Sequence, residues 1–142
     1  MTSGAEPVEE SAAEEALIVA NADVVKARQT VRALAQQARL SLVDQTKLVT
    51  AASELARNTL TYGGGGTMRV SIVSRGVKRG VKVTFRDEGP GISDLDLALT
   101  DGWSSGKGMG LGLSGARRLA DEFELASEPG KGTRVVVVKW AR

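Results

Sequence analysis

A chain of 142 residues is long enough for one domain with a substantial hydrophobic core, and this one has neither cysteine nor histidine. Disulfides, thiol catalysis and imidazole bases are therefore excluded, as is a histidine that the chain phosphorylates on itself. The net charge of +2 hides an acidic segment, because residues 1–25 hold six acidic and no basic side chains, whereas the rest holds 19 basic and 11 acidic ones. The basic remainder suits nucleotide phosphates and an acidic protein partner.

Nucleic acid and membrane are not expected as partners. The basic residues are dispersed and the few aromatic residues form no stacking pattern. No apolar run approaches the roughly 20 residues of a membrane span, and no export signal opens the chain, so we expect a cytoplasmic protein. Residues 1–13 are small, polar and acidic, which predicts a flexible leader before a single domain at 14–142.

The first half of the domain predicts one strand and two helices. A short apolar run within 15–21 suits a strand. Apolar residues then recur at helical spacing over 24–38, where Asn21 or Asp23 could cap the helix. Ser41 caps a second helix, whose apolar positions run from 42 to 60. The glycines at 63–66 end it, since glycine enters left-handed backbone geometry without a Cβ penalty.

The second half predicts two hairpins around a glycine-rich region. Residues 68–74 and 81–85 alternate or cluster apolar and β-branched side chains, with 76–80 between them. A short helical turn is possible at 94–99, and a further helix follows the second glycine segment. Residues 123–127 and 133–140 read as a closing hairpin with a turn at 129–132. We expect an α+β fold, a two-layer sandwich of a mostly antiparallel sheet with helices on one face.

The segment Asp87-Glu88-Gly89-Pro90-Gly91 could read a nucleotide base. Asp87 follows an apolar strand, so its carboxylate should stand at the strand end and could accept a hydrogen bond from the amine of adenine. Gly89 and Gly91 would let the backbone approach the base. A plain turn explains this segment as well when it is taken alone. The hydroxyl of Thr133, after the last turn, could complete the polar lining, although an ordinary strand threonine is equally compatible.

A second glycine segment runs into an apolar helical pattern. Four glycines alternate with other residues over 106–112, and the sites expected to hold phosphate are Gly106, Lys107, Gly108, Met109, Gly110, Leu111 and Gly112. Backbone N–H groups at a helix start bind phosphate, and the helix dipole favours negative charge there. A flexible linker is the alternative, but linkers rarely carry large apolar residues between their glycines. The spacing matches neither a Walker loop nor a dinucleotide-binding turn.

Glu54 and Asn58 lie four residues apart, so they share a helix face. The amide oxygen of Asn58 is a suitable ligand for Mg²⁺, and the carboxylate of Glu54 could deprotonate a hydroxyl. Alone, such a pair is usually solvated surface. Arg57 could assist phosphate binding. Trp103 could belong to a lid, anchor a partner protein or lie in the core, whereas Trp140 is expected in the core or at a hydrophobic edge.

Together these segments resemble the Bergerat-fold ATP-binding family, which includes gyrase and the histidine kinases. Residues 54–58 resemble its N box, 87–91 its first glycine box and 106–112 its second. The resemblance implies ATP and Mg²⁺ bound between sheet and helices under a lid at about 92–108. It makes Glu54 the general base, Asn58 the Mg²⁺ ligand, and Asp87 the reader of adenine.

The stretch 41–60, with Tyr62 and four glycines behind it, and the ending Gly132-Thr133-Arg134 are similar to bacterial stress-response switch kinases. That similarity implies a serine/threonine-protein kinase that phosphorylates STAS-domain antagonist or scaffold proteins of a stressosome-like module. Once released, such a kinase activates a PP2C-type phosphatase. The acidic leader departs from this compact pattern.

Two alternatives stay open. An anti-sigma factor that sequesters a sigma subunit would share all three boxes, and a sigma-subunit pull-down would distinguish it. A detached ATP domain of a histidine kinase would need an external dimerisation partner, and the short segment between the glycine boxes leaves little room for a long lid.

Overall fold

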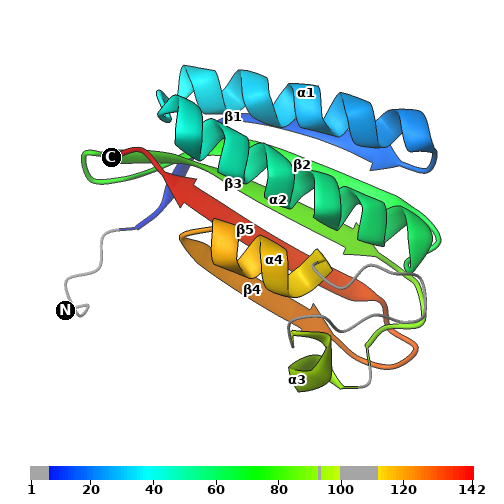
Figure 1. Cartoon of the computed structure of the whole chain (residues 1–142). Coiled ribbons are helices and arrows are strands. Elements are labelled where there is room, and N and C mark those ends of the chain that lie inside the picture. The colour runs from blue at the N-terminus through cyan, green and yellow to red at the C-terminus, as the bar shows by residue number, and fades with distance from the viewer. Residues whose placement is uncertain (1–6, 93, 100–111) are drawn as a thin grey trace.

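A computed structural model describes residues 7–92, 94–99 and 112–142 as one α+β sandwich, which confirms the predicted fold class. The elements in chain order are β1 (Glu9–Ile18), α1 (Asn21–Gln37), α2 (Leu42–Thr61), β2 (Gly66–Arg75), β3 (Lys78–Asp87), α3 (Leu95–Ala98), α4 (Gly112–Leu119), β4 (Glu122–Ser127) and β5 (Thr133–Trp140). All strand pairs are antiparallel, in the order β1-β2-β3-β5-β4. Helices α1, α2 and α4 cover one face of the sheet (Figure 1).

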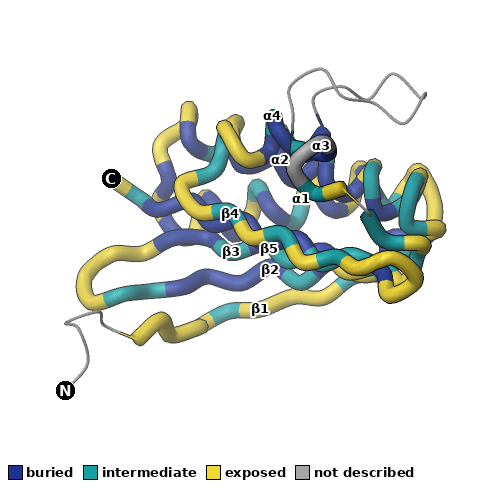
Figure 2. The backbone as a smooth tube through the Cα atoms, turned by 90° about the horizontal axis from the view of Figure 1, so that it is seen from below, coloured by how far each residue is buried: buried dark blue, intermediate teal, exposed yellow. Residues whose placement is uncertain are grey.

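The hydrophobic core lies between this sheet and its helices. Side chains alternate across a strand, so every second residue of the central strands faces the helical layer. Figure 2 shows β2 and β3 buried along much of their length, whereas β1 is largely exposed. The fully buried large side chains are Phe85, Ile18, Leu34, Leu48, Leu55, Met68, Val31, Val70, Val73, Val81, Val83 and Val137.

The two long helices begin differently. The hydroxyl of Ser41 accepts the N–H of Asp44 at 3.1 Å, which confirms the predicted cap of α2. The predicted cap of α1 is wrong, because Ala20 precedes the helix. The carboxylate of Asp23, inside the first turn, instead accepts the N–H groups of Val19 and Ala20, both at 3.0 Å. An acidic side chain there also opposes the positive end of the helix dipole.

Strand β1 corrects the expected leader, because residues 9–13 are strand and not flexible chain. They pair with β2, with an irregularity between Glu10 and Ala12. Arg69 on β2 forms ion pairs with Glu10 and Glu15, so the acidic side chains that suggested a solvated tail hold this edge strand against the sheet.

The first hairpin is tighter than expected. Strand β3 begins at Lys78, so only Gly76 and Val77 separate it from β2, and the predicted gap at 76–80 is wrong. Cross-strand pairing outweighs the weak local signal of Lys78 to Gly80. The short helix after the first glycine box and the closing hairpin are confirmed. In the described ranges, no helix is both long and apolar enough to cross a membrane.

The face of the sheet away from the main core carries a smaller apolar cluster of Val73, Val136, Val138 and Trp140. The indole ring of Trp140 lies 5.0 Å from the guanidinium of Arg75 and 5.1 Å from the ammonium of Lys78, and its N–H donates to Glu122 at 2.6 Å. The expectation of a hydrophobic edge for Trp140 is confirmed, since the side chain is buried under these charged neighbours.

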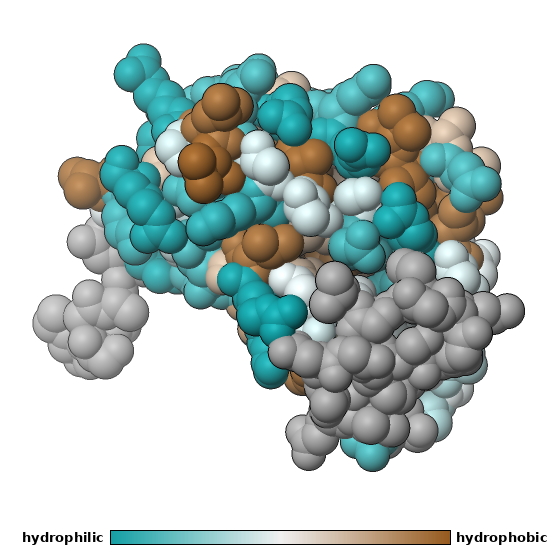
Figure 3. Space-filling view, viewed as in Figure 1, coloured by the Kyte–Doolittle hydropathy of each residue, from teal (hydrophilic) through white to brown (hydrophobic). Residues whose placement is uncertain are grey.

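The helical side of the molecule shows apolar side chains in separate patches between hydrophilic ones (Figure 3). The large apolar residues that the helices expose are Val25, Leu42 and Val43. Single exposed apolar residues are ordinary on a folded chain.

Candidate functional site

Helix α2 presents Glu54 and Asn58 one turn apart. The carboxylate of Glu54 is 29% exposed and pairs with the guanidinium of Arg57 at 3.2 Å. Asn58 is half-buried, and its side-chain oxygen is buried with no hydrogen-bond partner among the described residues. A buried polar atom without a partner is uncommon in a folded protein, so this oxygen is suited to an external ligand.

The start of α4 closes on Asn58. A Cβ at Gly112 would lie 2.8 Å from the side-chain nitrogen of Asn58 and 3.2 Å from its oxygen, so a side chain there would displace the amide. Glycine at 112 therefore lets the first turn of α4 rest against the amide. The positive N-terminal end of α4 therefore lies next to the side-chain amide of Asn58.

Asp87 ends strand β3, as the sequence predicts. Its carboxylate accepts the N–H of Gly89 at 2.9 Å and is also bonded by the backbone of Thr133, its cross-strand partner. Burial raises the pKa of Asp87 above its ordinary value, and these two hydrogen bonds only partly offset the effect. The side chain is thus a fixed, half-buried acceptor at the end of the sheet.

Several glycines lie close to the Asp87 carboxylate and leave the space that it occupies. A Cβ at Gly63 would lie 2.4 Å from the Asp87 carboxyl carbon, and one at Gly89 would lie 2.8 Å from Gly63. A Cβ at Gly132, where φ is +80°, would collide with the backbone carbonyl of Asp87. The sequence identified Gly63 only as a helix terminator, because proximity to Asp87 across 24 positions leaves no local signal.

Ser127 is a residue that the sequence analysis missed. Its hydroxyl accepts the N–H of Ile92 at 2.8 Å and lies 2.9 Å from the carbonyl of Gly132 and 2.8 Å from the hydroxyl of Thr133. It therefore fastens the chain beyond the first glycine box to the β4–β5 turn. A serine before Glu-Pro-Gly reads as an ordinary turn residue, so no pattern distinguished it.

The β4–β5 turn and the first glycine box make further contacts. The N–H of Gly130 donates to the carbonyl of Pro90 at 2.7 Å. Gly91, at φ +77°, packs so closely on the carbonyl of Glu128 that a Cβ would lie 2.0 Å from it. Gly91 is thereby required for the backbone path around the site.

A cleft of about 990 Å³ opens beside these residues, lined among others by Asp87, Ser127, Lys131 and Thr133. The structure thus brings Asp87, Gly89 and Thr133 together at one end of the sheet, and Asn58 together with Gly112 at the start of α4. Gly106, Lys107, Gly108, Met109, Gly110 and Leu111, as well as Trp103, lie outside the described residues.

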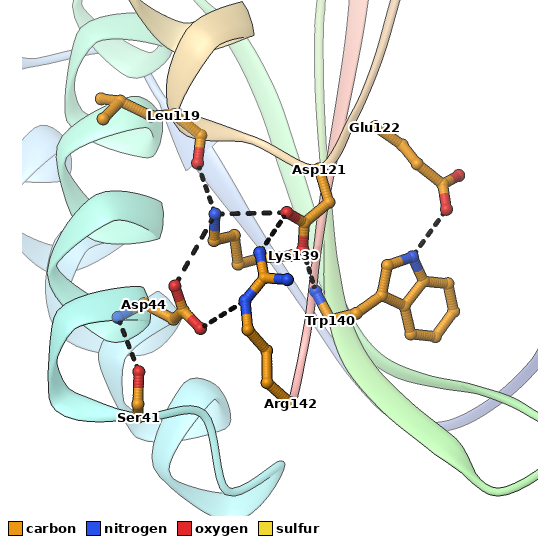
Figure 4. A network of polar contacts seen from close by, with 8 residues as sticks. All are labelled: Ser41, Asp44, Leu119, Asp121, Glu122, Lys139, Trp140 and Arg142. Atoms are coloured by element: carbon orange, nitrogen blue, oxygen red, sulfur yellow. Dashed lines mark hydrogen bonds and ion pairs between the residues drawn. The ribbon is translucent and has the colours of Figure 1, made fainter.

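The far end of α4 is anchored by an ionic network (Figure 4). The ammonium of Lys139, a side chain only 4% exposed, donates to the carbonyl of Leu119 at 3.0 Å and pairs with Asp121 at 3.3 Å and Asp44 at 3.7 Å. Arg142 bridges the same two carboxylates. This network ties the end of α4 to α2 and β5, which fixes the helix that touches Asn58.

The pKa of Asp121 reflects the balance between burial and the cations of this network. Burial would raise the pKa of Asp121, but the N–H of Trp140, Lys139 and Arg142 together lower it below its ordinary value. The carboxylate is therefore held in its charged form, as a stable counterion for the buried ammonium.

Comparison with known proteins places this geometry among nucleotide-binding domains. The family model described as histidine kinase-, DNA gyrase B-, and HSP90-like ATPase matches residues 43–141. The serine/threonine-protein kinase RsbT of Bacillus subtilis is 43% identical over 120 residues, which cover 84% of this chain and 90% of the relative. An anti-sigma F factor of Shouchella clausii is 32% identical over 118 residues, covering 80% and 81%.

A solved structure shares the fold. The crystal structure of the RsbU and RsbW domains of a Mycobacterium tuberculosis protein superposes with a TM-score of 0.62 at 18% identity. The match covers 93% of this chain and 33% of that one. At this identity the likeness concerns the fold alone.

Proposed function

Because this chain belongs to the histidine kinase-, DNA gyrase B- and HSP90-like ATPases, we propose that it is an ATP-dependent serine/threonine-protein kinase acting on another protein. One observation carries the proposal: Glu54 stands one turn before Asn58, whose unpartnered oxygen lies against the start of α4. A base and a phosphate-side ligand are thereby held on one rigid helix. The 43% identity with the kinase RsbT supports the same activity.

The adenine would bind at the end of the sheet. The carboxylate of Asp87 would accept a hydrogen bond from its amine, and Thr133 would complete the polar lining. Gly89 and Gly91 would act indirectly, by letting the first glycine box pack closely on Gly63 and Glu128 beside the site. Guanine presents a carbonyl oxygen at that position, which the carboxylate would repel. The phosphates would lie against the segment 106–112, of which Gly112 alone is described.

Asn58 fits the role of a Mg²⁺ ligand. Its amide oxygen is a hard donor, is buried, and has no hydrogen-bond partner among the residues that the structure describes. When bound, Mg²⁺ would offset the negative charge of the phosphates. Phosphoryl transfer depends mainly on positioning and charge stabilisation, so a rigid donor on α2 is what the chemistry requires.

Glu54 would act as the general base. The hydroxyl oxygen of a partner's serine or threonine attacks the γ-phosphorus, its proton passes to the Glu54 carboxylate, and ADP leaves. The side chain is exposed enough to meet a hydroxyl from another protein, and Arg57 orients its carboxylate. The acceptor must come from outside, because the partner's docking supplies its alignment.

We further propose STAS-domain antagonist or scaffold proteins as substrates and a PP2C-type phosphatase as the target activated on release. The likeness to RsbT supports this partner-switching role.

The test is transfer of label from radiolabelled ATP with Mg²⁺ to serine or threonine of STAS proteins encoded beside this chain. Glu54→Ala should abolish transfer and leave ATP and partner binding intact, because the polar contact that Glu54 makes with the described residues is an exposed pair with Arg57, which adds little to stability. Asn58→Ala should weaken binding of the Mg²⁺ form of ATP. Loss of partner binding in Glu54→Ala would contradict the catalytic role.

A sigma-sequestering module is the second candidate, favoured by the 32% identity with an anti-sigma F factor. ATP binding without transfer, together with capture of a purified sigma subunit, would decide for it.

A further inference from the structure

The sheet face away from the helices holds a groove of about 460 Å³. Its cations are Arg69, Lys82, Arg86 and Arg134, and Thr67 and Thr84 add hydroxyl groups. Asp87 and Thr133 are a cross-strand pair, and so are their neighbours Arg86 and Arg134. Because successive side chains point to opposite faces, the arginines of this groove lie behind the residues of the candidate adenine site.

The charges of this groove are incompletely neutralised. Arg69 has two glutamate partners, Glu10 and Glu15. Within the described part of the chain, Lys82 and Arg86 have no ion pair, and Arg134 reaches only Glu124, at 3.6 Å. The Nε atom of Arg134 is buried and finds no hydrogen-bond partner in the described ranges.

The pairing of Arg86 with Arg134 is itself unfavourable. Like charges directly opposite each other on neighbouring strands destabilise a sheet. Local choices that oppose the fold occur mainly where function requires them. Two adjacent guanidinium groups with free donors are suited to bind carboxylates, which they hold in a forked geometry.

The surroundings of the groove select the kind of anion. Its described lining contains no aromatic side chain on which a base could stack, and Trp140 lies outside it under Arg75 and Lys78. Glu15 lines the groove and Glu124 adjoins it at Arg134, so a long phosphate backbone would meet negative charge at both sides. A short run of carboxylates fits between them.

We propose that this groove binds an acidic segment of a protein partner, whose carboxylates pair with Arg86, Arg134 and Lys82. The groove lies on the sheet face opposite the helices and meets the nucleotide cleft at the end of the sheet, where Thr67, Arg86 and Arg134 line both. The proposal does not depend on kinase activity.

The test uses the full chain and a short fluorescein-labelled peptide of alternating glutamate and threonine, followed by fluorescence anisotropy. Arg86→Gln with Arg134→Gln should weaken binding about tenfold or more, because the peptide's carboxylates lose two charged hydrogen-bond donors that are partly screened by solvent. Lys26→Gln with Lys47→Gln removes the same charge from exposed helix positions and should leave binding unchanged. The arginine variant should also be at least as stable to urea as the wild type, which a structural role for these arginines would not give.

Three outcomes would overturn the proposal. The first is wild-type binding no tighter than to a peptide with glutamine in place of glutamate. The second is equal weakening by both double variants, which would indicate net charge only. The third is tighter binding of a single-stranded RNA of matched charge, which would assign the groove to nucleic acid.

Discussion

Gly63→Ala is the sharpest probe of the adenine site. The new Cβ would lie 2.4 Å from the carboxyl carbon of Asp87 and 2.5 Å from Oδ2, where ordinary carbon contacts need about 3.5–4.0 Å. Asp87 must therefore move by about 1 Å, away from the position fixed by the N–H groups of Gly89 and Thr133. A charged hydrogen bond to adenine is worth about 1.5–3 kcal/mol, so ATP affinity should fall by about tenfold to a hundredfold.

The assay is calorimetric titration with ATP, alongside urea unfolding of the free protein. Overpacking should lower the free energy of unfolding by about 1–3 kcal/mol, so the variant needs a control of similar stability. Gly130→Ala supplies it, since its Cβ would meet nothing within 4 Å while its φ of +78° costs about 1–2 kcal/mol. ATP affinity of Gly63→Ala within twofold of the wild type would refute the reasoning.

Three further predictions concern Asp87, Ser127 and the ionic network behind the site. Burial raises the pKa of Asp87, so acidification should weaken ATP binding already at a pH above about 3.9, the ordinary pKa of aspartate. Calorimetric titrations with ATP at falling pH should show this loss of affinity. The same pH dependence of ATP affinity in Asp87→Asn would contradict it. The same raised pKa means that Asp87 favours folding below its unfolded-state pKa, and that this contribution is lost as pH rises through the folded-state pKa. Ser127→Ala should lower the free energy of unfolding by about 1–2 kcal/mol and weaken ATP binding, with rescue by Ser127→Thr, because the N–H of Ile92 loses its acceptor; unchanged urea midpoint and affinity would exclude this. Lys139→Met should lower the free energy of unfolding in urea by about 3–5 kcal/mol, because Asp44 and Asp121 lose a buried cation. A decrease under about 1 kcal/mol would show that Arg142 alone neutralises the two carboxylates.

Local patterns predicted most of the sheet and helices. Alternating apolar residues, the Ser41 cap and the glycine turns each act within a few residues, so they are legible in sequence. Strand β1 was underestimated because its ion pairs are with Arg69, about 55 positions away, and an acidic run without them resembles a solvated tail.

The candidate site divides in the same way. Asp87, Asn58 and Thr133 belong to recognisable segments, and the structure places Asp87 beside Thr133 as expected. Ser127 and Gly63 act through contacts across the fold, so their roles depend on which turn lies against which strand. Sequence reasoning identified the groups that could perform chemistry and missed those that hold them in place.

The space beside Asp87 has a consequence for comparing related chains. The carboxylate is accommodated only because position 63 carries no side chain. A homologue that keeps glutamate at 54 and asparagine at 58 but has alanine at 63 would keep both proposed phosphate-side groups and should still bind ATP more weakly, because its aspartate at 87 is displaced. We therefore expect the residue at position 63 to grade nucleotide affinity among related chains whose residues 54 and 58 are the same.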